Sequence, residues 1–222
     1  MCSSDLENIG LDEAYAVQSP EDNKRLYAKW AKTYESDFVE AKKYRYPLAI
    51  SEFFNEKVPT ELISNVVDIG TGTGLVGHYL TQMRANLLID GLDISKEMLA
   101  EAAKKMRANG SPVYRHCFER DLTLEVEGTS APYDALISSG TFTHGHLGPE
   151  AINNLIPLVR QGGYFVIGAN AEHFAARGFE AFIKGLAAME IITEPEFNKI
   201  HVYDEGSPHY GDQSVVSLFR RA

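Results

Sequence analysis

Residues 66–74 read Val-Val-Asp-Ile-Gly-Thr-Gly-Thr-Gly, an apolar run that passes into alternating glycines and then into a helix-like segment from Leu75. This order predicts a buried strand, a glycine-rich turn and a helix whose first backbone N–H groups are open to a ligand. Glycine also lets a ligand approach the backbone closely. Asp68 stands at the end of the predicted strand, so its charge bears on which ligand the turn accepts.

The composition of the 222-residue chain is that of an ordinary globular protein and fits one domain with a full core. With 31 acidic and 21 basic side chains the net charge is −10, which argues against a nucleic-acid partner. No apolar run approaches the length of a membrane span, and the start of the chain lacks a signal-peptide pattern. Because Cys2 and Cys117 are the only cysteines, we expect no disulfide framework, no cysteine zinc site and a cytoplasmic location. The sequence leaves the oligomeric state open.

Strand-like and helix-like segments alternate along the chain. Short apolar runs predict strands at residues 65–69, 87–92, 113–118, 133–138 and 164–169, with β-rich stretches near 190–200 and 214–220. Amphipathic spacing and capping residues predict helices at residues 21–40, 47–57, 75–84, 95–109, 149–159 and 171–188. The alternation predicts right-handed crossovers and a mainly parallel sheet with helices on both faces.

Two of the predicted helices carry a distinct apolar stripe. In residues 21–40, aromatic and apolar side chains recur every four residues, at Leu26, Trp30, Tyr34 and Phe38. In residues 95–109, Ser95 is the expected N-cap. The apolar face of that helix should consist of Met98, Leu99, Ala102, Ala103 and Met106.

The glycine turn fits two kinds of cofactor. Gly72, Gly74 and Gly77 satisfy the dinucleotide pattern G-x-G-x-x-G, so an NAD(P)-dependent oxidoreductase is one alternative. Three observations count against it: Asp68 would repel a pyrophosphate, about sixty residues precede the first parallel strand, and the glycines begin already at Gly70. S-adenosylmethionine (SAM) carries an ammonium and a sulfonium group and no phosphate, so an acidic strand end suits it.

Two further acidic residues follow predicted strands. Asp93 ends the second strand, 25 residues after Asp68, where the ribose hydroxyls of a nucleoside would meet an acid. The alternative is an acid that only complements the dipole of the following helix. Asp121 follows the third strand and is placed to bind the adenine amine, with Leu122 packed on the ring. A surface-loop aspartate is the alternative there.

Together these motifs resemble those of the class I SAM-dependent methyltransferases over residues 21–170. The segments that carry the resemblance are 66–74, 91–99, 121–122, 133–139 and 158–169. Residues 137–146, the aromatic N-terminal part and the final Val-Val-Ser-Leu-Phe-Arg-Arg look most like the methyltransferase-like proteins of the Williams–Beuren syndrome chromosome region. The resemblance implies a Rossmann-like, doubly wound α/β fold with a mostly parallel sheet ordered 3-2-1-4-5-7-6 and strand 7 antiparallel. Residues 1–60 would form a helical lid within the same domain as the SAM-binding core of residues 61–222.

The resemblance also implies which residues bind the cofactor. Asp68 and the glycine turn would hold the methionine moiety, and Asp93 the ribose. Asp121 with Leu122 would hold the adenine. Aromatic residues of the lid would close over the cofactor, although core packing is the alternative for each of them. The expected set is Tyr27, Tyr34, Asp68, Gly70, Thr71, Gly72, Gly74, Leu75, Asp93, Ile94, Met98, Asp121, Leu122, Ser138 and Ser139.

His144 and His146 follow the fourth strand, at the edge of such sheets where ligands bind. Histidine titrates near neutral pH, so both are candidates for a general base that takes a proton from the acceptor. A loop histidine held by hydrogen bonds and a partial metal site are the alternatives. No further ligands stand at a recognisable spacing, so we expect no metal. In the tail, His209 and Tyr210 are candidates to line an acceptor pocket.

The acceptor itself is the least defined element. The Asn/Asp-Pro-Pro-aromatic motif of many nucleic-acid and glutamine N-methyltransferases is missing after the fourth strand, where Ser138-Ser-Gly-Thr-Phe stands. Together with the acidic balance, this favours a small-molecule acceptor over a nucleic-acid base. The sequence therefore predicts a SAM-dependent methyltransferase, with an oxidoreductase or a non-catalytic SAM-binding module as alternatives.

Overall fold

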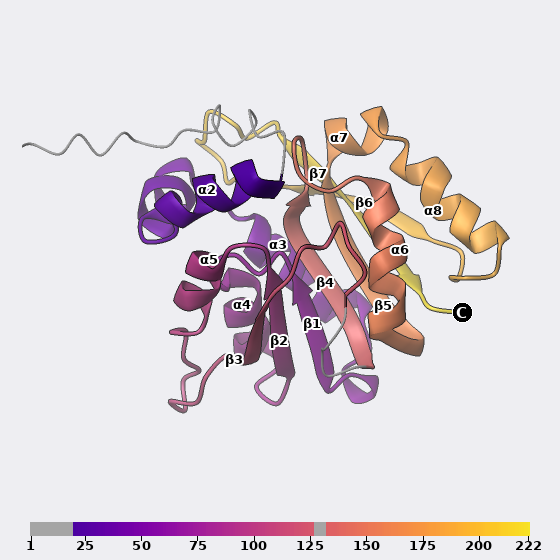
Figure 1. Ribbon diagram of the computed structural model, residues 1–222, viewed down its shortest axis with the longest axis horizontal. Helices are drawn as coiled ribbons and strands as arrows, with labels where there is room; N and C mark the ends of the chain where they lie inside the picture. Colours follow the sequence, from indigo (N-terminus) through magenta and orange to yellow (C-terminus); the bar gives the residue numbers. More distant parts are fainter. Residues whose placement is uncertain (1–19, 127–131) are drawn as a thin grey trace, which may run out of the picture.

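The computed structural model describes residues 20–126 and 132–222 and contains one seven-stranded sheet, in the order β3-β2-β1-β4-β5-β7-β6. Five strands run parallel: β1 (Asn65–Ile69), β2 (Leu88–Asp93), β3 (Tyr114–Glu119), β4 (Tyr133–Phe142) and β5 (Val159–Asn170). The strand β7 (Gln213–Arg220) is antiparallel to both β5 and β6 (Glu196–His201). The predicted fold class and strand order are thus confirmed (Figure 1).

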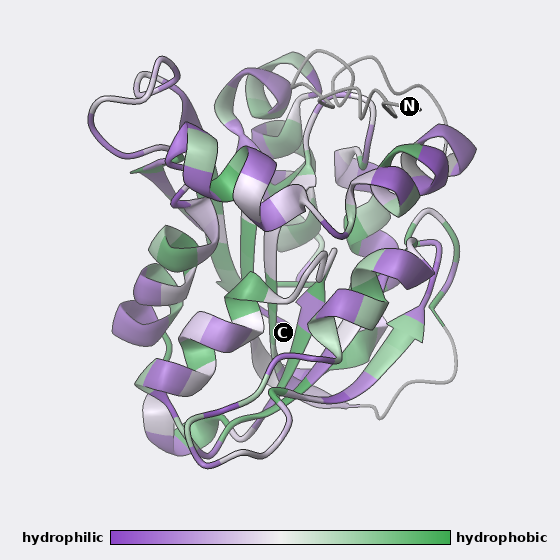
Figure 2. Cartoon of the chain, turned by 90° about the vertical axis from the view of Figure 1, so that its left-hand side faces the viewer, coloured by the Kyte–Doolittle hydropathy of each residue, from purple (hydrophilic) through white to green (hydrophobic). Residues whose placement is uncertain are grey.

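Helices cover both faces of this sheet and bury one core on each. The helices α3 (Tyr46–Lys57) and α4 (Leu75–Met83) contribute to the first core, and α6 (Ile152–Leu155), α7 (Ala171–Ala176) and α8 (Phe179–Ala188) to the second. Neighbouring residues of a strand point to opposite faces, so Val66 lies in the first core and Val67 in the second. Figure 2 shows the apolar strands enclosed between helices with hydrophilic outer sides.

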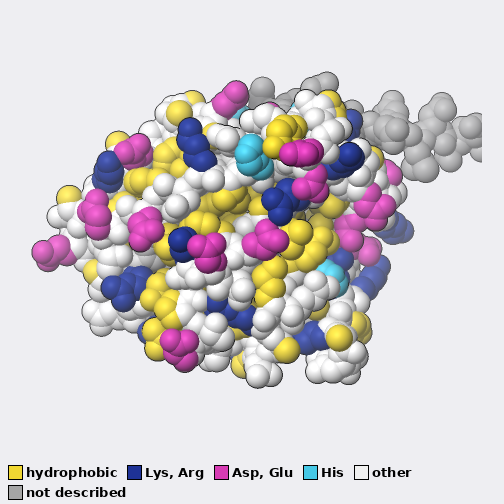
Figure 3. All heavy atoms as spheres, turned by 180° about the vertical axis from the view of Figure 1, so that it is seen from behind, with side chains coloured by type: hydrophobic (Ala, Val, Ile, Leu, Met, Phe, Trp, Pro, Cys, Tyr) yellow, Lys and Arg dark blue, Asp and Glu magenta, His cyan; other side chains and the backbone are white. Residues whose placement is uncertain are grey.

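The surface carries charges of both signs. On the face seen from behind in Figure 1, acidic and basic side chains are interspersed around apolar atoms (Figure 3). Within the described parts of the chain, no helix is both long and apolar enough to cross a bilayer.

The predicted helix over residues 21–40 is two elements. The helix α2 (Pro20–Trp30) ends in a turn, and the π-helix η1 (Tyr34–Glu40) follows. Eight residues of straight α-helix would separate Trp30 and Phe38 by about 12 Å along the axis. Their ring centroids instead lie 5.3 Å apart, and both side chains are buried. The break therefore lets the two buried rings contact each other, which one straight helix would not.

The helix predicted from Ser95 is shorter than its sequence pattern. Ser95 caps it as predicted, accepting a hydrogen bond from the Met98 amide, but α5 (Lys96–Ala102) ends early. Beyond it Ala103 and Met106 are exposed, so that part of the predicted apolar face is wrong. The Arg107 guanidinium donates to four backbone carbonyls and holds the segment as a loop; these belong to Ala85, Leu87, Pro112 and Val113.

Glycine and proline also interrupt two other predicted helices. Residues 171–188 form α7 and α8, which are separated at Gly178, where φ is +68°. A left-handed residue of this kind ends an α-helix. Residues 149–158 form the short turns η3 (Pro149–Ala151), α6 and η4 (Ile156–Leu158), because Pro157 lacks the N–H that a continuous helix needs. A further short turn, η2 (Thr60–Leu62), precedes β1.

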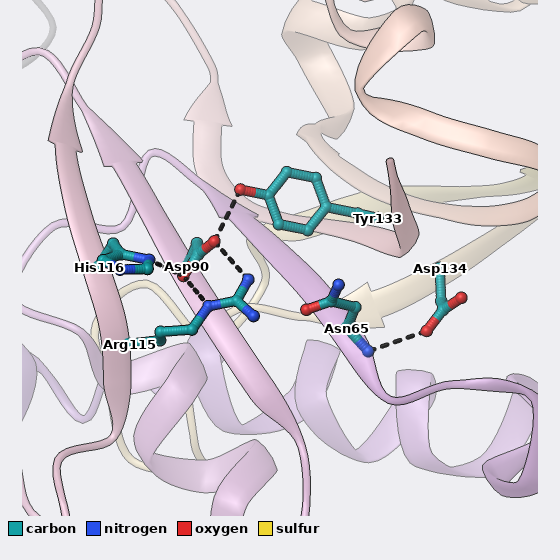
Figure 4. A network of polar contacts seen from close by, with 6 residues as sticks. All are labelled: Asn65, Asp90, Arg115, His116, Tyr133 and Asp134. Carbon is teal, nitrogen blue, oxygen red and sulfur yellow. Dashed lines mark hydrogen bonds and ion pairs between the residues drawn. The ribbon is translucent and has the colours of Figure 1, made fainter. Parts of the chain in front are cut away.

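A buried polar cluster connects β2, β3 and β4. The Asp90 carboxylate is fully buried and accepts hydrogen bonds from Arg115 at 2.7 and 2.9 Å and from the Tyr133 hydroxyl at 2.9 Å (Figure 4). A ring nitrogen of His116 lies 3.1 Å from the same carboxylate. Burial alone would raise the pKa of Asp90, but the bonds from Arg115 and Tyr133 outweigh it and leave the pKa below its usual value.

Candidate functional site

A cavity opens at the carboxyl ends of the central strands, where parallel α/β sheets bind their ligands. Four parts of the chain form its wall: the glycine turn, the ends of β2 to β5, the N-terminal aromatic segment and the loop before β7. The wall residues include most of those predicted to bind the cofactor, namely Tyr27, Tyr34, Gly70, Thr71, Gly72, Leu75, Asp93, Ile94, Met98, Asp121, Leu122 and Ser139.

The glycine turn has the backbone that its sequence predicts. Gly70, Gly72 and Gly74 have φ values of +68°, +55° and +87°, a region that other residues rarely adopt. Gly70 also makes room for Thr141: a Cβ on Gly70 would lie 2.8 Å from the Thr141 Cβ and closer still to its Oγ1. Amides of Gly70 and Thr71 donate to the Leu92 carbonyl, which fixes the turn against β2.

Asp93 joins the turn to the start of α5. Its two carboxylate oxygens accept hydrogen bonds from the amides of Gly72 and Ser95, each at 2.8 Å. Burial raises the pKa of Asp93, and the bonds from the Ser95 and Gly72 amides oppose that rise. A half-buried carboxylate of fixed orientation therefore faces the cavity at the predicted ribose position.

Asp121 and Leu122 line the same cavity after β3. Asp121 accepts hydrogen bonds from the amide and hydroxyl of Thr123, at 3.0 and 2.7 Å, which closes a tight turn. Leu122 is buried and contributes an apolar surface to the wall. The pair thus offers a polar group beside an apolar one, as adenine requires.

The fourth strand continues beyond the predicted end at Ser138. The pairing of β4 with β5 is irregular between Ser138 and Phe142, and Gly140 has a φ of +75°. This irregularity brings Ser139, Gly140 and Thr141 into the wall, whereas the Ser138 hydroxyl donates to the Ile69 carbonyl at 2.9 Å. Ser138 itself does not line the cavity.

Asp68 does not line the cavity either. Its side chain is fully buried just before the turn, and one oxygen accepts a hydrogen bond of 2.7 Å from the Tyr114 hydroxyl. Burial raises the pKa of Asp68 to about 7. Gly74, which forms the N-cap of α4, also lies outside the wall and packs against Tyr114 and Ala102. Contact of either residue with the cofactor stays a prediction.

Aromatic side chains cover the cavity. The sequence indicates Tyr27, Trp30 and Tyr34 for this role, and all three line the wall. The rings of Trp30 and Tyr34 meet edge to face, with centroids 5.0 Å apart. Burial raises the pKa of Tyr34, so its hydroxyl stays protonated. Sequence reasoning missed four further aromatic wall residues, Phe38, Tyr44, Tyr46 and Tyr203, although the spacing of Phe38 after Tyr34 was a signal for the first of them.

Two distant segments meet over the cavity, and we call residues 43–46 with 202–214 the clamp. Tyr44 forms an isolated antiparallel bridge with Tyr203, and the Arg45 amide donates to the Val202 carbonyl at 3.0 Å. The Tyr46 hydroxyl is hydrogen-bonded to the buried Ser214 hydroxyl. His209 and Tyr210 are not among the wall residues of this cavity, whereas Val202, Tyr203 and Asp212 of the same loop are, so a place of His209 and Tyr210 at the acceptor stays a prediction.

The two candidate histidines lie in different places. His146 lines the cavity, and its ring meets Tyr27 edge to face with centroids 5.7 Å apart. His144 faces a neighbouring hollow beside Glu172, and its ring centroid lies 5.1 Å from that of His173. Among the described residues, no group of three or more His, Cys, Asp and Glu side chains is arranged to hold a metal ion.

The wall suits a cationic nucleoside ligand. Its described residues include the acids Asp93, Asp121 and Asp212 and no lysine or arginine. Two wall hydroxyls, those of Thr73 and Ser139, are buried without a hydrogen-bond partner among the described residues. Buried polar groups of this kind are rarely left unpaired, so a bound ligand would satisfy them. SAM, with its ammonium and sulfonium groups, fits these charges and the glycine turn.

Comparisons with known proteins agree with this site. Residues 67–165 match the family model described as "Methyltransferase domain". Among proteins with curated descriptions, none matches the chain significantly.

Solved methyltransferase structures share the fold. The SAM-bound magnesium protoporphyrin IX methyltransferase of Synechocystis PCC 6803 is 18% identical, with full coverage of both chains and a TM-score of 0.57. The O-methyltransferase TomG of Streptomyces achromogenes is 14% identical over 99% of this chain and 100% of its own, with a TM-score of 0.58. A SAM-dependent methyltransferase of Clostridium acetobutylicum is 15% identical over 88% of this chain and 99% of its own, also with a TM-score of 0.58.

At identities of 14–18% the solved structures show only that the fold is shared. The type of domain is shown by the family model. The matched region runs from β1 into β5 and contains the glycine turn, Asp93 and Asp121. Residues 67–165 are therefore a methyltransferase domain, the chain is a methyltransferase enzyme, and its fold is shared by methyltransferases solved with SAM or S-adenosylhomocysteine bound.

Proposed function

We propose that this enzyme transfers a methyl group to a small-molecule acceptor that binds beneath the N-terminal aromatic segment. The observation that carries the proposal is the extent of the cavity. Its wall continues past the residues assigned to the cofactor to Tyr44, Tyr203 and Asp212, which leaves an aromatic compartment over the glycine turn. A concave, largely aromatic compartment of this kind fits a small acceptor better than a macromolecular surface.

The named neighbours are consistent with this acceptor class. TomG is described as an O-methyltransferase involved in tomaymycin synthesis, and the Synechocystis enzyme as a magnesium protoporphyrin IX methyltransferase. We also propose that, among the class I SAM-dependent methyltransferases, this enzyme is most similar to the methyltransferase-like proteins of the Williams–Beuren syndrome chromosome region.

Each part of the site then has a role. The cofactor supplies an activated methyl group that a nucleophilic acceptor takes by in-line displacement. The glycine turn and Asp68 hold its methionine end, Asp93 its ribose, and Asp121 with Leu122 its adenine. Residues 1–60 act as a lid on the core of residues 61–222, and residues 1–19 of that lid lie outside the described residues. The aromatic wall excludes water and aligns the acceptor, which is the main requirement when the leaving group is already activated.

A panel of small acceptors tests the proposal. Purified enzyme with SAM should release S-adenosylhomocysteine with at least one phenol, amine, thiol or carbon acid, and only in the presence of that acceptor. Tight SAM binding without release across a broad panel would favour the non-catalytic module. Turnover on nucleic acid or protein alone would contradict the small-molecule class.

Asp93→Ala should weaken SAM binding by about 1–3 kcal/mol, the range for charge-assisted hydrogen bonds to a buried ligand. Glu97→Ala is the matched control, because Glu97 is the acid in the first turn of α5. If Asp93 only complemented the helix dipole, both variants would have similar small effects. Calorimetric titration with SAM separates the two, and unchanged affinity of the Asp93 variant would remove it from the ribose site.

We propose His146 as the general base for acceptors that arrive protonated. His146→Ala should then lower turnover by about 10²-fold at neutral pH, within the range for general base catalysis. The loss should shrink as the pH rises and the acceptor deprotonates by itself. His144→Ala is the matched control, since His144 lies outside the cavity, and should keep both the rate and the pH profile. Equal losses in the two variants would contradict this assignment.

A further inference from the structure

The sheet buries two aspartates on neighbouring strands, and they differ in their partners. Asp68 on β1 and Asp90 on β2 are both fully buried. Asp90 has the Arg115 guanidinium as its counter-ion (Figure 4). For Asp68 the described structure gives one hydroxyl partner, that of Tyr114, and leaves the Oδ1 atom buried with no hydrogen bond. Buried carboxylates are normally paired with a cation, so Asp68 lacks what Asp90 has.

No positively charged group of the described chain stands in for that cation. The titratable groups that act on Asp68 are Tyr114 and Cys117 from β3 and Asp93 from the end of β2. The carboxylate of Asp93 raises the pKa of Asp68 further, and the thiol of Cys117 is itself kept protonated by burial, which raises its pKa to about 11. A cationic ligand would therefore supply the counter-ion that keeps Asp68 ionised.

Three glycines make room for the Tyr114 ring next to Asp68. A Cβ at Gly77 would lie 2.5 Å from the Tyr114 hydroxyl, at Gly74 2.8 Å from its ring, and at Gly91 3.1 Å from its ring. Two of them, Gly74 and Gly77, belong to the pattern G-x-G-x-x-G that also fits a dinucleotide. In this chain their small size serves the packing of Tyr114 between the turn, α4 and β2.

The direction of the Tyr114 hydrogen bonds is fixed by its neighbours. The Gly77 amide, in the first turn of α4, donates to the Tyr114 hydroxyl at 3.0 Å. Because an amide N–H can only donate, the hydroxyl proton is left to point at Asp68 Oδ2, 2.7 Å away. Tyr114 thereby occupies one carboxylate oxygen and fixes the rotation of the side chain.

We propose that Tyr114 is a positioning residue for the cofactor, because it holds Oδ2 of Asp68 and leaves Oδ1 for the ammonium group of SAM. The inference rests on the proposed assignment of Asp68 to the methionine end. It is supported by the place of Asp68 in the chain, two residues before Gly70 of the cavity wall. An ammonium group would satisfy the oxygen that the described chain leaves without a partner.

The pairing has a consequence for pH dependence. Burial raises the pKa of Asp68 to about 7, so part of the cofactor-free protein carries a neutral carboxyl near neutral pH. A cation at Oδ1 stabilises the carboxylate, and SAM binding should therefore release a proton. The affinity for SAM should fall as the pH decreases from 7.5 to 5.5. The hydrogen bond from the Tyr114 hydroxyl lowers the pKa of Asp68, so removal of the hydroxyl should raise that pKa. The decrease in SAM affinity should then begin at a higher pH.

Tyr114→Phe tests the proposal, and the sheet supplies a matched control. Tyr133→Phe removes the same kind of hydroxyl from the other buried aspartate, Asp90. Calorimetry would use SAM and 5′-methylthioadenosine, which has the adenosine but no ammonium group, between pH 5.5 and 7.5. Tyr114→Phe should weaken SAM about tenfold at pH 7, as expected for a lost bond to a charged group, and leave 5′-methylthioadenosine within twofold. Tyr133→Phe should leave both ligands within twofold.

Two results would overturn the inference. Equal weakening of SAM and 5′-methylthioadenosine by Tyr114→Phe would show a packing role, and so would equal weakening of SAM by the two tyrosine variants. A SAM affinity of the wild type that does not change with pH would contradict the proton release. The proposed acceptor chemistry is judged separately, since a wild type that binds SAM but releases no S-adenosylhomocysteine contradicts that function and not the role of Tyr114.

Discussion

Gly70→Ala should abolish measurable SAM binding and lower the free energy of unfolding by about 3 kcal/mol, the sum of a strained left-handed residue and an overpacked contact. The added Cβ would overlap the side chain of Thr141, whose hydroxyl donates to the Ile69 carbonyl in the same turn. Relief would require the end of β4 or the turn to shift, and both form the cavity wall. Urea unfolding and calorimetry with SAM measure the two effects.

Gly72→Ala is the control that separates strain from overlap. Gly72 also has a left-handed φ, of +55°, but the nearest atom to a Cβ there is the Gly70 carbonyl oxygen at 4.0 Å. Its substitution should therefore cost only the backbone strain, about 1–2 kcal/mol. Equal destabilisation by both alanines would mean that Thr141 moves aside freely, and the close packing of the turn against β4 would then have no energetic role.

Asp68→Asn should weaken SAM binding by about 3 kcal/mol, near 10²-fold, because the proposed buried charge pair with the SAM ammonium group loses one partner. The same change should flatten the pH dependence of stability. A carboxyl whose pKa is raised on folding binds its proton more tightly in the folded state, so the fold loses stability as the pH rises through that range. For a pKa near 7 in the folded state, this loss between pH 5 and 8 is about 1–3 kcal/mol.

Unfolding of the cofactor-free protein at pH 5 and pH 8 measures this difference. Between pH 5 and pH 8 the free energy of unfolding of the wild type should fall by this amount relative to that of Asp68→Asn. Any destabilisation by the amide that does not depend on pH is the same at both pH values and cancels in the comparison. Asp90→Asn should behave oppositely, since the pKa of Asp90 is lowered on folding and its contribution is lost only as the pH falls through acid values. Parallel pH profiles of the wild type and Asp68→Asn would show that Asp68 titrates normally.

Local sequence patterns were sufficient for the alternation of strands and helices and for most of the cofactor side of the cavity, whereas the strand order was predicted from the resemblance to a known family. The segment from Val66 to Gly74 predicts its own strand, turn and helix, because each residue there is decided by near neighbours. Asp93 and Asp121 follow strands, and parallel strand ends necessarily share one edge of the sheet. Their presence in the wall therefore follows from topology alone.

Long-range pairing decides what the sequence could not reveal. The end of β4 bends because its pairing with β5 slips between Ser138 and Phe142, and no local pattern marks that slip. Tyr44 enters the wall only because Tyr203 bridges to it. Likewise Asp68 satisfies the predicted position at the strand end, but its burial beneath the turn depends on Tyr114, a residue of another strand.

The clamp also determines at which stage of chain synthesis the cavity wall can be completed. Residues 43–46 are synthesised well before their partners at residues 202–214, because more than 150 residues lie between the two segments. Contacts between segments so far apart in sequence form late in folding, because the entropy cost of closing a long loop must be met before the contacts stabilise the chain. A growing chain that already contains the glycine turn therefore still lacks the part of the cavity wall that the clamp forms. Cofactor capture should accordingly follow the synthesis of residues 202–214, and it should stabilise the folded site rather than guide early folding.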